Sequence, residues 1–116
     1  MLLGFEFLEV SMPEKIAFRM QLNPGCAVEY KRRHDQIWPE LSELLTSSGV
    51  RDYSIYLDES SHALFAVLWR ADGHTMDDLP NHAIVRKWWD YMADIMETEA
   101  DNTPKIWELQ PMFQLD

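Results

Sequence analysis

Alternating apolar and polar residues predict most of the strands in this chain. From Lys15 to Leu22 every second residue is apolar, which is the pattern of a half-buried strand. A second stretch, Val50 to Leu57, alternates in the same way. The polar turn at residues 58–61 then leads into a third apolar stretch from His62 to Trp69. Because so short a turn separates the second and third stretches, we expect them to form a β-hairpin.

The sequence predicts helices in two longer segments, one after the first strand and one after the third. The pair Asn23-Pro24 is typical of a helix start, with proline in the first turn. This helix is expected to bend or end near Trp38-Pro39, and a second segment is expected to stop at Gly49. Asn81 predicts the N-cap of another helix, running from about His82 to Met96.

The predicted order of elements is β-α-β-β-α-β across residues 15–116, a single domain. Its last strand is expected from Lys105 to Leu115, broken at Pro111. This order is typical of the ferredoxin-like sandwich of the α+β class, an antiparallel sheet with the helices on one face. Residues 1–14 lack the basic start and cleavage site of a signal peptide. We interpret them as an extra N-terminal arm or the result of an upstream start codon ahead of Met12.

The third strand is apolar on both of its faces, which has a consequence for assembly. Leu64, Ala66 and Leu68 alternate with Phe65, Val67 and Trp69. The helices can cover only one face of the sheet, so the other face needs a second cover. We therefore expect a homodimer built on the open sheet face, in a dimeric α/β barrel-type assembly.

Charge and composition narrow the classes of partner and cofactor. A net charge of −10 over 116 residues argues against nucleic acid or an anionic membrane as partner. Cys26 is the single cysteine, which excludes an internal disulfide and fits a reducing compartment. The four histidines lack metal-ligand spacing, and no glycine-rich phosphate loop occurs. A metal site and nucleotide binding are therefore both disfavoured.

The candidate chemistry is concentrated between residues 30 and 41. Tyr30, His34 and Trp38 are four residues apart, a spacing that would stack them on one helix face. Histidine titrates near neutral pH, and aromatic rings offer flat apolar surfaces to the C–H faces of a sugar. The alternative for His34 is a boundary histidine hydrogen-bonded beside Asp35.

Three further aromatic residues extend this candidate site. Trp88 and Trp89 are adjacent, so on a helix they point about 100° apart and at most one sits squarely in the core. The other indole is either a boundary residue or a platform for a sugar ring. Tyr53 begins the inward face of its strand, whereas Tyr56 lies on the opposite face.

Several blocks of the chain resemble the L-rhamnose mutarotase family. They are Asn23-Pro24, the segment from Tyr30 to Leu41, Tyr53 to Asp58, Trp88 to Met96, and Asp101 to Pro104. The resemblance implies a cytoplasmic, dimeric, ferredoxin-like isomerase that interconverts the α and β anomers of L-rhamnopyranose without metal or cofactor. It also implies that His34 is the proton donor and that the sugar site is lined by Tyr30, Tyr53, Trp88 and Trp89.

The sequence is also compatible with two other functions. One is a non-catalytic dimeric ferredoxin-like module that binds a ligand. The other is a cofactor-free monooxygenase of the same fold, with an aromatic pocket and a histidine. The mixture of polar and aromatic groups favours a sugar as ligand.

Overall fold

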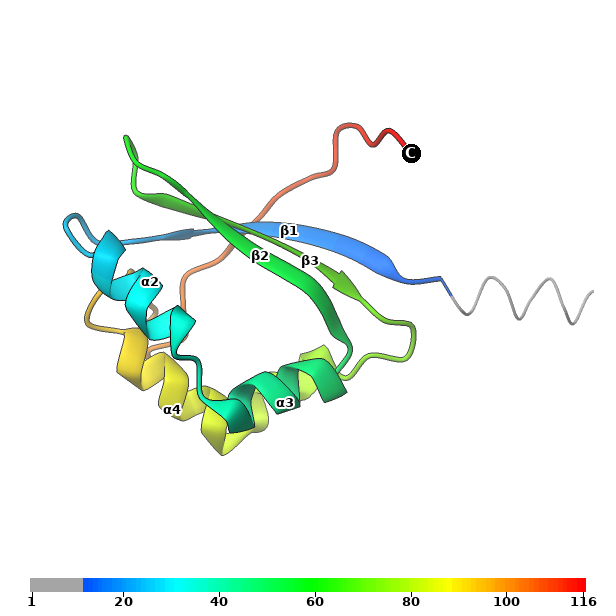
Figure 1. Cartoon of the computed structure of the whole chain (residues 1–116), viewed down its shortest axis with the longest axis horizontal. Coiled ribbons are helices and arrows are strands. Elements are labelled where there is room, and N and C mark those ends of the chain that lie inside the picture. The colour runs from blue at the N-terminus through cyan, green and yellow to red at the C-terminus, as the bar shows by residue number, and fades with distance from the viewer. Residues whose placement is uncertain (1–11) are drawn as a thin grey trace, which may run out of the picture.

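The structure is a computed structural model that describes residues 12–116. Within this range, one antiparallel sheet has the order β2-β3-β1-β4. Its strands are β1 (Glu14–Gln21), β2 (Val50–Asp58), β3 (Ala63–Arg70) and β4 (Trp107–Glu108). The helices α2 (Ala27–Asp35), α3 (Pro39–Ser47), η1 (Met76–Asn81) and α4 (Ala83–Met92) connect them. Figure 1 shows the helices on one side of the sheet, which confirms the predicted ferredoxin-like α+β class.

The core lies between the helices and one face of the sheet. From the sheet, Met20 of β1 and Leu64 and Ala66 of β3 face this layer, each at most 5% exposed. From α4, Val85 and Met92 meet them in the same apolar cluster. Alternation along β3 therefore buries its even-numbered residues, as the pattern predicted.

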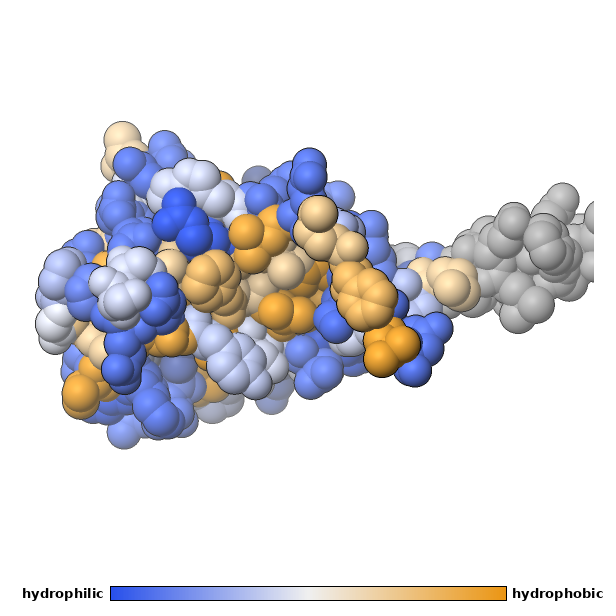
Figure 2. All heavy atoms as spheres, turned by 90° about the horizontal axis from the view of Figure 1, so that it is seen from above, coloured by the Kyte–Doolittle hydropathy of each residue, from blue (hydrophilic) through white to orange (hydrophobic). Residues whose placement is uncertain are grey.

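The other face of β3 carries the second apolar set. Phe65, Val67 and Trp69 are all half-buried. On this face Phe65 lies opposite Arg19 of β1 and Tyr56 of β2. Figure 2 looks down on this side of the sheet, where apolar side chains gather beside the C-terminal segment.

The predicted start of the first helix is wrong by several residues. Residues 23–25 form a turn, and α2 begins at Ala27 with Cys26 at its N-cap. Gly25 adopts a φ of +81°, a left-handed conformation that a helix cannot include. Asn23 instead ties the end of β1 to the turn after α4, because its backbone N–H donates to the Ile95 carbonyl.

The break in this helical region is confirmed. Pro39 begins α3, and Gly49 follows its last residues with a φ of +102°. A Cβ on Gly49 would lie 2.7 Å from the Cβ of His74, so this position requires glycine for space as well as for conformation.

The helix expected from His82 to Met96 is shorter, with different ends. Residues 76–81 form the 3-10 helix η1, so Asn81 is not the cap, and α4 starts at Ala83 after His82. The helix ends at Met92 because the following residues pair with the end of β1, where Met96 forms an isolated bridge with Leu22. Tertiary pairing thus replaces the last predicted turn.

The last strand is also shorter than predicted. Only Trp107 and Glu108 pair with β1, and one further bond runs from the Leu109 N–H to the Ala17 carbonyl. The guanidinium of Arg19 lies 3.9 Å from the centre of the Trp107 ring. Residues 109–116 then continue, exposed, without a ladder, and Pro111 has no N–H to extend one.

Residues 1–11 of the predicted N-terminal arm lie outside the described range. In residues 12–116, no helix is long and apolar enough to cross a membrane. The same residues contain no group of three or more histidine, cysteine, aspartate or glutamate side chains placed to hold a metal ion.

Candidate active site

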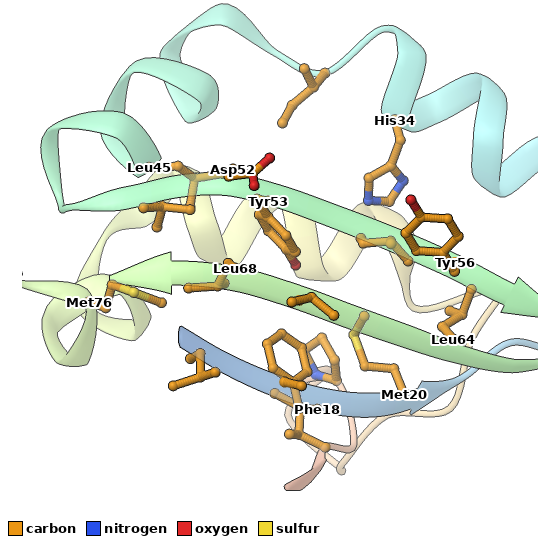
Figure 3. A pocket seen from close by; sticks show the side chains of 18 of the residues that line it. Phe18, Met20, His34, Leu45, Asp52, Tyr53, Tyr56, Leu64, Leu68 and Met76 are labelled. Atoms are coloured by element: carbon orange, nitrogen blue, oxygen red, sulfur yellow. The ribbon is translucent and has the colours of Figure 1, made fainter. Parts of the chain in front are cut away.

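A cleft between the helical layer and the sheet brings together the five residues singled out from the sequence. It is lined by Tyr30 and His34 of α2, Tyr53 of β2, and Trp88 and Trp89 of α4. Figure 3 shows the His34 ring pointing into this cleft from the helical layer, with Tyr53 reaching in from the sheet.

Tyr30 and His34 form the centre of the site, one turn apart on α2. Their rings stack with centroids 4.3 Å apart and planes 25° from parallel. The Trp88 indole also contacts the imidazole, with ring centroids 5.3 Å apart and planes nearly perpendicular. The imidazole is therefore held between a phenol and an indole, which fixes its direction in the cleft.

Trp38 joins the same aromatic cluster by a route that helical spacing did not predict. Helix α2 ends at Asp35, so Trp38 lies outside it, as the N-cap of α3. Its indole meets Trp88 edge-on at 5.0 Å and stacks on Tyr91 at 5.6 Å. The break before Pro39 thus turns Trp38 toward α4 rather than placing it above His34 on one helix face.

The protonation of His34 follows from its surroundings. Its Nδ1 lies 3.1 Å from the Tyr30 carbonyl oxygen, which can only accept a hydrogen bond. Nδ1 therefore carries the hydrogen of the neutral ring, and Nε2 presents a lone pair. Burial lowers the pKa of the His34 imidazole, outweighing the smaller opposing effects of the Tyr30 carbonyl and the Asp35 carboxylate. The neutral form is thus favoured near pH 7.

The two phenols of the site are held in their protonated forms. Burial raises the pKa of Tyr30 well above its ordinary value, and the neighbouring Tyr53 adds to this rise. Burial among the cleft residues also raises the pKa of the Tyr53 phenol, although 40% of the residue's surface remains open to solvent. Both hydroxyl groups are therefore available to donate hydrogen bonds at neutral pH.

The two adjacent tryptophans differ in burial, as their 100° separation on the helix predicts. Trp88 is a core residue, 8% exposed, within the aromatic cluster around His34. Trp89 is half-buried, lines the cleft and has the Arg86 guanidinium 5.3 Å from its ring centre. Of the two indoles, Trp88 is the one in ring contact with His34.

A buried arginine that the sequence analysis missed joins α2 to the end of α4. Arg33 is 8% exposed and donates to Glu29 at 2.7 Å, to the Tyr91 carbonyl at 2.7 Å and to both Asp94 oxygens at 2.8 and 3.2 Å. The guanidiniums of Arg32 and Arg33 lower the pKa of Glu29 to about 2. Arg33 thereby holds the helix of His34 against the helix of Trp88. The only sequence signal was the spacing of four residues from Glu29 to Arg33.

Asp52 is the second missed residue of the cleft, and it lies next to Tyr53 at its wall. Strict alternation along a strand assigns neighbouring residues to opposite faces, so the sequence pattern gave no reason to place both side chains here.

Comparison with known proteins identifies the group to which this chain is related. The family profile described as L-rhamnose mutarotase matches residues 15–115. An L-rhamnose mutarotase from Sinorhizobium fredii is 61% identical over 102 residues, which cover 88% of this chain and 98% of that protein. One from Jannaschia is 58% identical, again over 88% of this chain and 98% of the relative.

A solved structure agrees with these sequence matches. The crystal structure of an L-rhamnose mutarotase from Formosa agariphila superimposes with a TM-score of 0.83 at 47% sequence identity, covering 89% of this chain and 99% of that one. The fold, the cleft and these matches lead to one conclusion. The chain belongs to the L-rhamnose mutarotase family.

Proposed function

We propose that this protein interconverts the α and β anomers of L-rhamnopyranose by moving a proton through His34. The observation that supports this most is the imidazole held between Tyr30 and Trp88 in an open cleft, with Nε2 left as a proton acceptor. The family relationship points to the same reaction and the same sugar. Interconversion of the two anomers requires no redox step, because they are stereoisomers with the same atomic composition.

Ring opening begins with neutral His34. Its Nε2 accepts the proton of the anomeric hydroxyl as the bond between C1 and the ring oxygen breaks, and the ring oxygen gains a proton from water in the open cleft. The free aldehyde then rotates about the C1–C2 bond. On closure the ring-oxygen proton leaves, and protonated His34 returns its proton to the new anomeric oxygen. His34 is thus the proton donor in the closing half of the cycle.

Tyr30 and Tyr53 orient the sugar in this scheme. Because burial raises the pKa of each phenol, both remain protonated and donate hydrogen bonds to sugar oxygens rather than carry the reacting proton. Trp88 and Trp89 supply apolar surface for C–H groups and for the C6 methyl of a 6-deoxyhexose. This wall favours L-rhamnose over a sugar with a C6 hydroxyl, by about a hundredfold at most for an apolar pocket.

The assembly we propose is a homodimer, with a second copy covering the open sheet face. Phe65, Val67 and Trp69 form the apolar centre of that face. The C-terminal segment adds Met112 and Phe113, which are 88% and 83% exposed. Burial of these side chains against a second copy would stabilise the assembly, by about 1.5–3 kcal/mol for each large apolar residue that becomes fully buried.

The single cysteine supports placement in the cytoplasm, where thiols stay reduced. The net charge of −10 supports a neutral sugar as ligand rather than a nucleic acid or an anionic membrane.

Polarimetry tests the proposed reaction. One freshly dissolved anomer of L-rhamnose approaches equilibrium slowly in buffer, and the protein should shorten this time in proportion to its concentration. D-Glucose, run in parallel, should be accelerated far less. Sugar binding without acceleration would instead identify a ligand-binding module. Oxygen uptake with a phenolic substrate and no effect on the sugar would identify the monooxygenase.

A further inference from the structure

The sheet contains a β-bulge at the wall of the cleft. In the pairing of β2 with β3, Arg51 lies opposite Trp69 and Ser54 lies opposite Val67. Only Leu68 remains on β3 to face the two residues between them, Asp52 and Tyr53. Two residues on one strand opposite one on its partner define a bulge.

This bulge places two consecutive side chains on the same side of the sheet. Leu68 is 2% exposed and faces the helical layer, so the residues opposite it face that layer too. Figure 3 shows the Asp52 carboxylate and the Tyr53 ring entering the cleft from β2, while His34 enters from α2. In a regular strand one member of the pair would face the open side.

The backbone at Asp52 is unusual in the way that binding sites often are. Its φ is +48°, in the left-handed region that few residues other than glycine adopt. Aspartate and asparagine tolerate this region better than most residues, yet glycine would fit it with less strain. A non-glycine residue in this conformation beside a catalytic cleft suggests that its side chain has a use.

The Asp52 carboxylate has room for a ligand. Within residues 12–116 it forms no hydrogen bond or salt bridge to another side chain or to the backbone, and it is exposed to the cleft. Around it the lining is apolar, with Leu45 of α3, Leu68 of β3 and Met76 of η1 nearby (Figure 3). A carboxylate accepts two hydrogen bonds side by side, which matches two neighbouring hydroxyl groups of a pyranose.

We propose that Asp52 binds an adjacent pair of sugar hydroxyl groups from the sheet side of the cleft while His34 acts from the helical side. The proposal rests on the mutarotase function given above and adds a residue that selects the sugar. The bulge aligns the carboxylate beside Tyr53, so the two residues hold the pyranose by its hydroxyl groups while the anomeric carbon faces His34. Asp52 is a binding residue in this scheme and carries no reacting proton.

Two substitutions keep the left-handed backbone and change only the side chain. Asp52→Asn retains one acceptor oxygen, and Asp52→Gly removes the side chain at a position that suits glycine. The steady-state kinetics of anomer exchange should show KM for L-rhamnose raised several-fold in Asp52→Asn and at least tenfold in Asp52→Gly, with kcat within about threefold of wild type. Glu59→Gln, in the exposed turn between β2 and β3, is the matched control and should leave both constants unchanged.

Mono-deoxy analogues of L-rhamnose identify the hydroxyl groups. At two adjacent carbons of the sugar, removal of the hydroxyl group should raise KM for the wild-type protein. In Asp52→Gly, whose KM for L-rhamnose is already raised, the same removal should change KM little. A fall in kcat at unchanged KM would show that Asp52 transfers a proton and would overturn the binding role. Unchanged constants in both variants, or deoxy effects of equal size in wild type and Asp52→Gly, would overturn it as well.

A binding measurement separates this proposal from the function on which it rests. In a His34→Ala background, quenching of tryptophan fluorescence reports L-rhamnose binding without turnover. Adding Asp52→Gly should weaken that binding at least tenfold. Equal binding in the single and double variants would overturn the role of Asp52, whereas failure of the wild-type protein to accelerate exchange would overturn the mutarotase assignment.

Discussion

Replacing Arg33 by methionine should destabilise the protein and disrupt the site together. The guanidinium is buried between α2 and the end of α4, where it donates to Glu29, to the Tyr91 carbonyl and to both oxygens of Asp94. Methionine resembles the aliphatic stem of arginine and has a similar helix propensity, but it has no donor. The substitution therefore removes the polar connection between the two helices while keeping most of the apolar contact.

The size of the effect follows from these contacts. Hydrogen bonds to charged groups contribute about 1.5–3 kcal/mol each, which makes four of them a large gross term. Most of it is offset, because the Glu29 and Asp94 side chains are 38% and 66% exposed and regain water when Arg33 is lost. We expect a net loss of about 2–4 kcal/mol. With a urea slope of about 2 kcal/mol/M, the unfolding midpoint should fall by about 1–2 M.

Arg32→Met is the matched control for this experiment. Arg32 is the neighbouring residue on α2 and also donates to Glu29, but its side chain is 50% exposed. It interacts with α4 through the Tyr91 side chain and makes none of the bonds to the Tyr91 carbonyl and Asp94 that Arg33 makes. Urea unfolding at one fixed protein concentration should give Arg32→Met a midpoint near wild type. Anomer exchange should drop in Arg33→Met and persist in Arg32→Met, because the buried bonds from α2 to the Tyr91 carbonyl and to Asp94 come from Arg33. Equal midpoints for the two variants would refute this reasoning.

Three further outcomes follow from the same structure. Burial lowers the pKa of His34, so its contribution to stability is complete above pH about 6.5 and is lost as the pH falls through the lowered value. In a plot of the urea unfolding midpoint against pH, His34→Gln should therefore remove the decrease in this acidic range, and an unchanged plot would contradict the prediction. If the proposed homodimer forms on the open sheet face, Val67→Asp should convert it to a 13.7 kDa monomer in sedimentation, and an unchanged mass would contradict this interface. Leu64→Ala, at a side chain 2% exposed, should lower the free energy of unfolding by about 2–5 kcal/mol in urea titration, whereas a loss under 1 kcal/mol would contradict its place in the core.

The fold was predictable because its signals are local. Alternation in residues 15–22 and 62–69 reports burial on one face, and Pro39 and Gly49 carry their own backbone preferences. The ends of elements were less predictable. Asn23 and Met96 were assigned to helix ends, yet both pair across the chain at the end of β1, a contact with no local signature.

The residues of the candidate site were also predictable only in part. The family resemblance named Tyr30, His34, Tyr53, Trp88 and Trp89, and the structure brings all of them to one cleft. Their catalytic and binding roles remain predictions. Arg33 escaped notice because a charged residue on a helix is usually exposed, and only the packing of α4 reveals that it is buried. Asp52 escaped because a bulge changes the facing of a side chain without changing the residue pattern.

The most direct test of the central claim is the rate of anomer exchange with and without the His34 imidazole. Saturation-transfer NMR on equilibrated L-rhamnose measures this rate at each pH, with wild type and with His34→Ala at equal concentrations. We predict that wild-type exchange falls as acid protonates Nε2, with a midpoint below pH about 6.5, and that His34→Ala is at least tenfold slower at pH 7 while remaining folded. A folded His34→Ala protein with near wild-type exchange, or a wild-type rate that stays flat from pH 8 to pH 4.5, would contradict it.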